Sequence, residues 1–236
     1  MFEDLLIKPL YNGFVFLIDL APGGDVGLAI IVLTLIVRII FYPAFAASIR
    51  TQIAMAAIQP EIDELNRKYK DNTEERARRT MALFKEKKVR PLAGLLALLV
   101  QIPIFIALYF VFFREGLPNI DTTLLYSFVS VPALVHTNFL GFIDLLATHN
   151  FILAGLVGGT QYLVTKLSLA RTPPKAATPE AEMAHTLQRS LMLYLLPGLM
   201  TALSFAFPAG VGLYFATGNV ISIAQEFYIK RQNRFN

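Results

Sequence analysis

Arg38 is the only charged residue in an apolar run that covers residues 26–45. As a helix this run is about 30 Å long, which is the thickness of the hydrocarbon core of a bilayer. A guanidinium at that depth is costly unless it faces protein or water, so such residues mark the paths of substrates or ions. The sequence therefore makes Arg38 the leading functional residue, with Thr34 four residues earlier on the same helical face.

Arg38 has an alternative role as an anchor at the membrane surface. The polar segment that follows begins near residue 46, about seven residues or roughly 10 Å further along a helix. A long basic side chain can reach an interface at that distance while its stem stays in lipid. The other apolar segments have to decide between a pathway and an anchor.

Polar side chains also interrupt other apolar segments. Gln101 lies in the middle of the second segment, and Tyr214 and Asn219 lie in the last. A lone amide inside a membrane usually joins one helix to another by a hydrogen bond. Several such residues converging on Arg38 would instead line a hydrated cavity, and the sequence allows both interpretations.

The composition indicates an all-α polytopic membrane protein with five transmembrane helices. Of the 236 residues, 55% are hydrophobic and 16% are charged, whereas about a quarter are charged in soluble domains. The sequence has no cysteine and only three histidines, so we expect no disulfide, no metal site and no cofactor. The predicted spans are residues 26–45, 91–113, 150–170, 189–207 and 208–229.

The distribution of basic residues predicts the orientation. Of the 21 Lys and Arg residues, 18 lie within 46–90, beside or within 166–189, or after 229. Basic residues gather on the cytoplasmic side, so the N-terminus is predicted outside and the C-terminus in the cytoplasm. The other predicted segments are an outer-face amphipathic helix (1–25), a cytoplasmic charged helical hairpin (46–90), an outer loop with an amphipathic helix (114–149), a cytoplasmic loop (171–188) and a cytoplasmic tail (230–236).

The hairpin at residues 46–90 contains acidic residues placed four before basic ones, an arrangement that supports exposed helices. It has 11 basic and 7 acidic residues, a net charge of +4 that could contact anionic lipid or ribosomal RNA. The alternative is an ordinary solvated face that follows the inside-positive rule. The acid-first pairs are Asp63 with Arg67, Glu64 with Lys68, Glu74 with Arg78, and Glu75 with Arg79.

The basic residues of this hairpin are the predicted surface for recruiting partners. They are Arg67, Lys68, Lys70, Arg76, Arg78, Arg79, Lys85, Lys87 and Lys88.

The chain lacks the motifs of the common hydrolases and nucleotide-driven enzymes. It has no phosphate-binding glycine loop, no His-Glu-x-x-His, no Gly-x-Ser-x-Gly and no pair of aspartates within the predicted spans. We therefore predict that the protein is not an enzyme.

Several motifs, in the same order along the chain, resemble the YidC/Oxa/Alb family of membrane protein insertases. The resemblance covers nearly the whole chain and is closest to the compact five-span bacterial form. The motifs are Thr34 to Arg38 with Tyr42-Pro43, Ile58-Gln59-Pro60-Glu61-Ile62, Lys88 to Gly94, Leu99 to Tyr109, Phe139 to Leu145, Lys166-Leu167-Ser168 and Phe207 to Asn219.

The resemblance implies a function, a location and a site. It implies a hydrophilic groove in the bacterial plasma (inner) membrane, open to the cytoplasm and to lipid. From this groove, hydrophobic segments and short polar tails of client proteins would enter the bilayer without nucleotide hydrolysis. The groove residues are expected to be Arg38, Thr34, Gln101, Tyr214, Phe215 and Asn219, where Phe215 replaces a tyrosine found in some members.

The resemblance also implies the partners. These are nascent or newly made membrane proteins and the lipid bilayer, with the ribosome, a targeting receptor and a Sec-type translocon as further candidates, and no DNA. Two other functions are consistent with the residues alone. A small-solute transporter or channel would also place Arg38 in a cavity, whereas a structural assembly chaperone of membrane complexes would bond Arg38 and Gln101 to each other or to backbone carbonyls.

Overall fold

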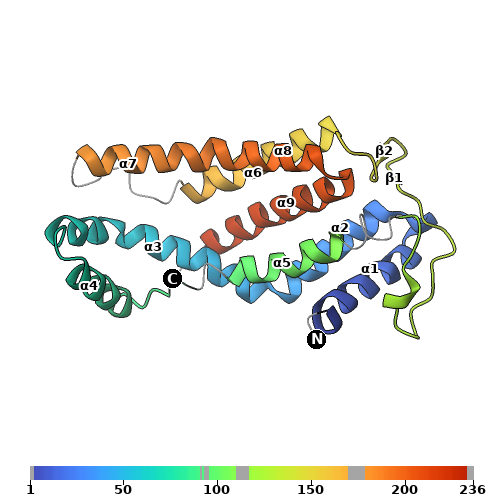
Figure 1. Ribbon diagram of the computed structural model, residues 1–236, viewed down its shortest axis with the longest axis horizontal. Coiled ribbons are helices and arrows are strands. Elements are labelled where there is room, and N and C mark those ends of the chain that lie inside the picture. Colours follow the sequence, from blue (N-terminus) through green and yellow to red (C-terminus); the bar gives the residue numbers. More distant parts are fainter. Residues whose placement is uncertain (1–2, 91, 93–95, 110–116, 170–178, 233–236) are drawn as a thin grey trace.

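The computed structural model describes residues 3–90, 92, 96–109, 117–169 and 179–232. These residues are mostly helical, and the predicted all-α membrane architecture is confirmed (Figure 1). In chain order the elements are α1 (Lys8–Leu20), α2 (Val26–Ile40), α3 (Tyr42–Lys68), α4 (Thr73–Glu86), α5 (Leu96–Tyr109), β1 (Asn138–Phe139), β2 (Ile143–Asp144), α6 (Phe151–Leu169), α7 (Pro179–Ser190), α8 (Leu196–Ala206) and α9 (Ala209–Gln232).

Two helices in the described residues are long and apolar enough to cross a membrane. They are α6 and the continuous helical stretch His185–Ala206, which joins the end of α7 to α8 through a π-helical turn. The pair α2 and α3 makes a third if the two count as one bent span. Helix α9 has the length, but its glycines and polar residues lower its hydropathy. The predicted second span, 91–113, lies partly outside the described residues.

The predicted first span is broken by a bend of 69° between α2 and α3. Phe41 separates the two helices, and Pro43 occupies the first turn of α3. A proline there has no N–H to donate, and its ring clashes with the backbone of the preceding turn, which favours a break in the helix at this point. Helix α2 therefore ends at Ile40, and Arg38 lies in its last turn rather than in mid-helix.

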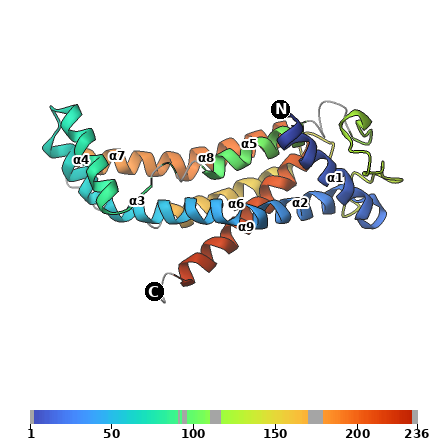
Figure 2. The same cartoon turned by 90° about the horizontal axis from the view of Figure 1, so that it is seen from below.

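The hairpin predicted at 46–90 is present as α3 and α4, which fold back on each other. Its own small apolar core contains Ile58, Leu83 and Val89, with Ile62 and Phe84 packed around them. Figure 2 shows this hairpin at one end of the molecule, with α1 and the β1–β2 hairpin at the other. Because α3 runs unbroken from Tyr42, the hairpin is rigidly continuous with the helix that follows the bend.

The outer segment differs from its prediction. Residues 117–149 contain a short 3-10 turn at Thr122–Leu124 and the antiparallel pair β1–β2, and no α-helix. The expected amphipathic helix is therefore wrong for these residues. Pro132 lacks a backbone donor, and Gly141 adopts a φ of 78° in the turn between the strands, a conformation that ends regular helix.

Large apolar side chains cover the outside of α6 and α8. Leu163, Leu199 and Phe151 are each about half exposed or more. A soluble protein rarely exposes so much contiguous apolar surface, whereas a membrane protein presents it to lipid.

Helix α1 was predicted to lie in the outer interface, and it packs against α2 and α5. Phe14 and Ile18 are fully buried at this contact. Asn12, also buried, holds the following loop: its Nδ2 donates to the Leu124 carbonyl at 2.8 Å, and its Oδ1 accepts from the Tyr126 N–H at 2.7 Å. These bonds fasten residues 124–126 to α1 across more than a hundred residues of sequence.

We expect Asn12→Ala to lower the free energy of unfolding by about 1–3 kcal/mol, because it removes the side-chain partner of a buried carbonyl and of a partly buried N–H. Equilibrium unfolding in detergent measures the change. Asn138→Ala is the matched control, since Asn138 is exposed. Equal stabilities of the two variants would contradict the role of Asn12.

Candidate functional site

Arg38 lies where α2 meets α9. Its guanidinium carbon is 4.2 Å from the centre of the Phe45 ring, in a cation–π contact across the bend. A Cβ atom added to Gly218 of α9 would come within 3.2 Å of the guanidinium, so glycine permits this close approach. The side chain is partly exposed, and it makes no hydrogen bond or ion pair with the described residues.

Gln101 and Tyr214 connect α5 to α9. The Gln101 amide donates to the Tyr214 hydroxyl at 2.7 Å, and the tyrosine is 7% exposed. The Arg38 guanidinium lies against Gly218, one helical turn after Tyr214 on α9. Three predicted site residues, Arg38, Gln101 and Tyr214, are therefore brought together around α9.

Asn219 and Thr34 make other contacts. The Asn219 amide donates to the Thr160 hydroxyl of α6 at 3.1 Å, and both side chains are buried. The Thr34 hydroxyl donates to the Ile30 carbonyl of its own helix at 2.6 Å. Asn219 thus joins two helices, and the hydrogen of Thr34 is already used within α2.

Phe215 belongs to an aromatic group between α5 and α9. Its ring centre lies 5.4 Å from that of Tyr214 and 6.4 Å from that of Phe105. Phe105 in turn meets Phe207 edge to face at 6.1 Å. Phe215 therefore presents an apolar contact where a tyrosine would add a hydroxyl.

Phe45, Gly218 and Thr160 are contact residues of this site that the sequence prediction missed. Gly218 lies four residues after Tyr214, so helical spacing alone would have placed both on one face of α9. The described residues contain no group of three or more His, Asp or Glu able to hold a metal ion. The chemistry of the site is accordingly that of one cation, two amides, hydroxyls and aromatic rings.

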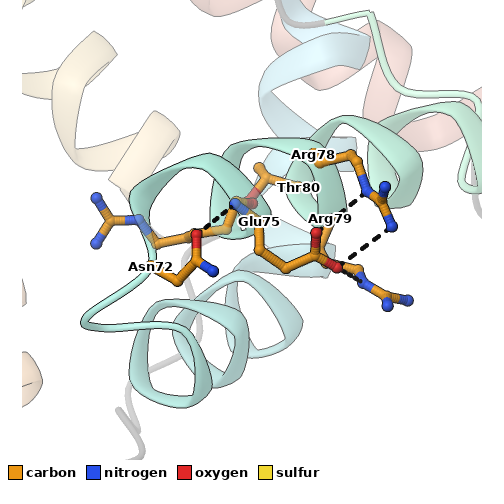
Figure 3. Close-up of polar contacts among 6 residues, drawn as sticks. Asn72, Glu75, Arg78, Arg79 and Thr80 are labelled. Atoms are coloured by element: carbon orange, nitrogen blue, oxygen red, sulfur yellow. Dashed lines mark hydrogen bonds and ion pairs between the residues drawn. The ribbon is translucent and has the colours of Figure 1, made fainter.

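The hairpin residues form fewer acid–base pairs than expected. Of the four predicted pairs, Glu75 with Arg79 is present at 2.8 Å (Figure 3). Glu75 also holds Arg78 at 3.2 Å, in place of the predicted Glu74. Asn72 begins α4 by accepting the Glu75 N–H through its side chain at 3.0 Å.

Asp63 makes a different contact from the one predicted with Arg67. Its carboxylate accepts from the Gln59 amide at 3.0 Å and lies 3.5 Å from the His185 ring of α7. The Asp63 side chain is 8% exposed. The hairpin is thereby connected to α7 by a polar contact that is shielded from solvent.

The other predicted recruitment residues differ in their contacts. Lys87 pairs with Glu61 at 2.8 Å, and Lys68 lies 5.7 Å from the centre of the Tyr69 ring. The remaining five make no ion pair with residues in the described part of the chain: Arg67, Lys70, Arg76, Lys85 and Lys88. All of these residues are exposed except Arg76, which is half-buried.

We expect the Gln101–Tyr214 bond to appear as a coupling energy of about 0.5–1.5 kcal/mol in a double-mutant cycle of Gln101→Leu and Tyr214→Phe. Each single variant leaves one partner unpaired in an apolar place, whereas the double variant leaves neither. Unfolding of the four proteins in detergent gives the coupling. Strictly additive losses would show that the bond does not hold α5 to α9.

The Glu61–Lys87 ion pair predicts that the stability of the hairpin depends on pH. A hydrogen bond and the charge of Glu61 raise the pKa of Lys87. Because the pKa of Lys87 is higher in the folded protein, the ion pair stabilises the hairpin fully below the ordinary pKa of lysine. This stabilisation is lost as pH rises through the pKa of Lys87 in the folded protein. We expect Glu61→Gln to remove that alkaline component and to lower the Lys87 pKa, measured by NMR of labelled lysine.

Glu64→Gln is the control for this titration, because Glu64 is exposed and has the same charge. An unchanged Lys87 pKa in Glu61→Gln, or an equal fall in Glu64→Gln, would count against the pair.

Comparison with known proteins matches the chain both to a family model and to individual membrane proteins. A model of the family described as "60Kd inner membrane protein" matches residues 18–236. The chain is 33% identical over 229 residues, 96% of its length, to a protein of Cellvibrio japonicus named "Membrane protein insertase YidC". It is 36% identical over 210 residues, 88% of its length, to a protein of the same name from Francisella tularensis subsp. novicida.

The chain spans about a third of the length of these relatives, 36% of the first and 33% of the second. The match nevertheless includes every helix from α2 to α9 and both strands. The apolar helices and the family together make it an inner membrane protein. The chain belongs to the 60Kd inner membrane protein family.

Proposed function

We propose that this chain is a membrane protein insertase. It moves hydrophobic segments and short polar tails of client proteins from a groove open to the cytoplasm into the bilayer, without nucleotide hydrolysis. Family membership and the name of the relatives support this function. The single observation that carries the site is the Arg38 guanidinium, which lies beside Gly218 and has no acidic partner in the described residues.

Arg38 acts on the polar tail of the client. At the low effective dielectric constant between helices, a cation attracts an acidic tail several times more strongly than in water. Its position in the last turn of α2 is electrostatically favourable, since the unpaired carbonyls of a helix end attract a cation. The charge is therefore tolerated by the bundle while remaining able to bind an anion.

The apolar part of the client supplies the driving force. Each Å² of apolar surface that moves from water into lipid contributes about 25 cal/mol, so a segment of some twenty residues needs no nucleotide. The exposed leucines of α8 offer such a segment an apolar wall. The Gln101–Tyr214 and Asn219–Thr160 bonds hold α5, α9 and α6 in place beside it.

The hairpin is the proposed recruitment element. Its solvent-facing Lys and Arg side chains are suited to nascent chains, the ribosome, a targeting receptor or a Sec-type translocon, because long-range charge attraction steers association. In this proposal the hairpin and the C-terminus lie in the cytoplasm, the N-terminus lies outside, and five spans cross the membrane. The contact of Asp63 with His185 supports a common side for the hairpin and α7.

A structural assembly chaperone is less well supported. That function predicts Arg38 and Gln101 bonded to each other or to backbone carbonyls, whereas the Gln101 amide donates to Tyr214. The cation of Arg38 meets an aromatic ring instead of a carbonyl.

Insertion into liposomes containing the purified protein tests the role of Arg38. With a small client that has an acidic translocated tail, we expect Arg38→Ala to reduce insertion by roughly tenfold, the effect of losing about 1.4 kcal/mol of attraction. A client with a neutral tail should lose much less. Arg38→Lys keeps the charge and loses the planar fork, so it should retain part of the activity.

Arg50→Ala is the control, since it removes the same charge from an exposed position on α3. Unchanged insertion of the acidic-tailed client by Arg38→Ala, or equal losses for both clients, would rule out the electrostatic role.

A further inference from the structure

The loop at residues 117–149 exposes large apolar side chains at the end of the molecule opposite the charged hairpin (Figure 2). Within it, residues 122–143 contain no Lys, Arg, Asp or Glu, whereas about a quarter of the residues of a soluble domain are charged. An uncharged loop with an apolar surface is poorly suited to water. The side chains that are more than half exposed are Phe128, Val131, Leu134, Leu140 and Phe142.

The turn between β1 and β2 holds one of these side chains at the expense of backbone strain. Leu140 has a φ of 54° and Gly141 a φ of 78°, and the Phe142 N–H donates to the Phe139 carbonyl across them. Turns with two positive φ values ordinarily take Asn, Asp or Gly, because a larger side chain is strained there. A leucine at the tip of the turn therefore indicates a use for its apolar side chain.

The two faces of the β1–β2 hairpin have different surroundings. Phe139 packs so closely on Gly27 of α2 that a Cβ atom added to this glycine would clash with the ring, and Ile143, its partner across the strands, is buried. Leu140 and Phe142 are exposed instead. The hairpin thus fixes itself to the bundle by one pair of apolar residues and presents a second pair outward.

Backbone hydrogen bonds hold the loop beside the ends of the long helices. The His136 N–H donates to the Gly24 carbonyl at 2.8 Å, just before α2, and the Gly210 N–H of α9 donates to the Leu145 carbonyl at 2.9 Å. The exposed Phe151 begins α6 at this same end of the bundle, where the lipid-facing surface of α6 starts. The exposed side chains of the loop therefore lie at the level where that surface begins.

The irregular backbone limits how deep the loop can lie. A lipid-exposed loop cannot enter the hydrocarbon core, because its N–H and C=O groups would lack partners there. Aromatic and aliphatic side chains at the ends of membrane helices are typical of the boundary between head groups and acyl chains. A partner protein would require a surface with a polar rim, whereas residues 122–143 have no charged side chain to supply one.

We propose that residues 126–142 are a membrane anchor. The side chains of Phe128, Leu140 and Phe142 insert into the lipid leaflet at this end of the bundle, among the first carbons of the acyl chains. Since the loop is bonded to the starts of α2 and α9, the anchor fixes the depth of the two helices that carry Arg38 and Tyr214. The proposal goes beyond the insertase function and does not depend on it.

Tryptophan fluorescence tests the anchor, because the sequence has no tryptophan and each introduced one is the only reporter. The purified chain is placed in phosphatidylcholine vesicles whose acyl chains carry bromine near the carbonyl end, which quenches tryptophan by contact. We expect Phe128→Trp and Phe142→Trp to lose most of their emission, as Phe151→Trp on α6 should. Met81→Trp is the matched control, since Met81 on the charged hairpin and Phe142 are both 68% exposed. It should be quenched by aqueous acrylamide and little by the lipid.

Two results would overturn the anchor. One is emission from both loop variants that acrylamide quenches and brominated lipid does not, which would place the loop in water. The other is blue-shifted emission that neither reagent quenches, which would mean that a second copy of the chain covers the loop.

The strained turn has its own test. Leu140→Asn suits the left-handed backbone and removes the apolar tip, so in a chain that also carries Phe142→Trp it should reduce quenching by brominated lipid while the protein stays folded. Undiminished quenching would contradict the role of Leu140. No client protein is present in these measurements, so they are independent of insertion activity.

Discussion

The bundle is governed by the need of every polar side chain within it to find a partner in the protein, because lipid offers none. Helix α9 supplies two such partners. Tyr214 accepts from α5 and Asn219 donates to α6, so one helix connects its neighbours through two hydrogen bonds on successive turns. Arg38 is the charged exception, held by a ring and by the close approach that Gly218 allows. This imbalance at Arg38 leaves a site that can bind an anion.

The bend at Phe41 makes this imbalance tolerable. It ends α2 two residues after Arg38, so the guanidinium lies at a helix terminus where carbonyl dipoles favour a cation. The same bend sends α3 away from the bundle as one unbroken helix to the hairpin. The cation and the hairpin are therefore positioned by a common cause, Pro43 in the first turn of α3.

The sequence predicted the features that local pattern determines. Apolar length and charge predicted the helices and the hairpin. The sequence also singled out Gln101, Tyr214 and Asn219, which form hydrogen bonds between helices. Features that depend on packing were not predictable. The partner of Asp63 is the distant His185 rather than Arg67, because the approach of α7 outweighs a weak pair within one helix. The outer loop lacks its expected helix, because tertiary bonds from Asn12 and turn residues replace periodicity.

The contact of Arg38 with Phe45 bears on how an insertase could load its client. The guanidinium meets an aromatic face rather than a carboxylate, so no ion pair has to break before an anion binds. The ring compensates only part of the cost of removing the cation from water, because a neutral ring attracts a cation less strongly than a carboxylate does. An acidic tail would therefore gain more at Arg38 than at an exposed cation of the hairpin, since the effective dielectric constant between helices is lower than that of water.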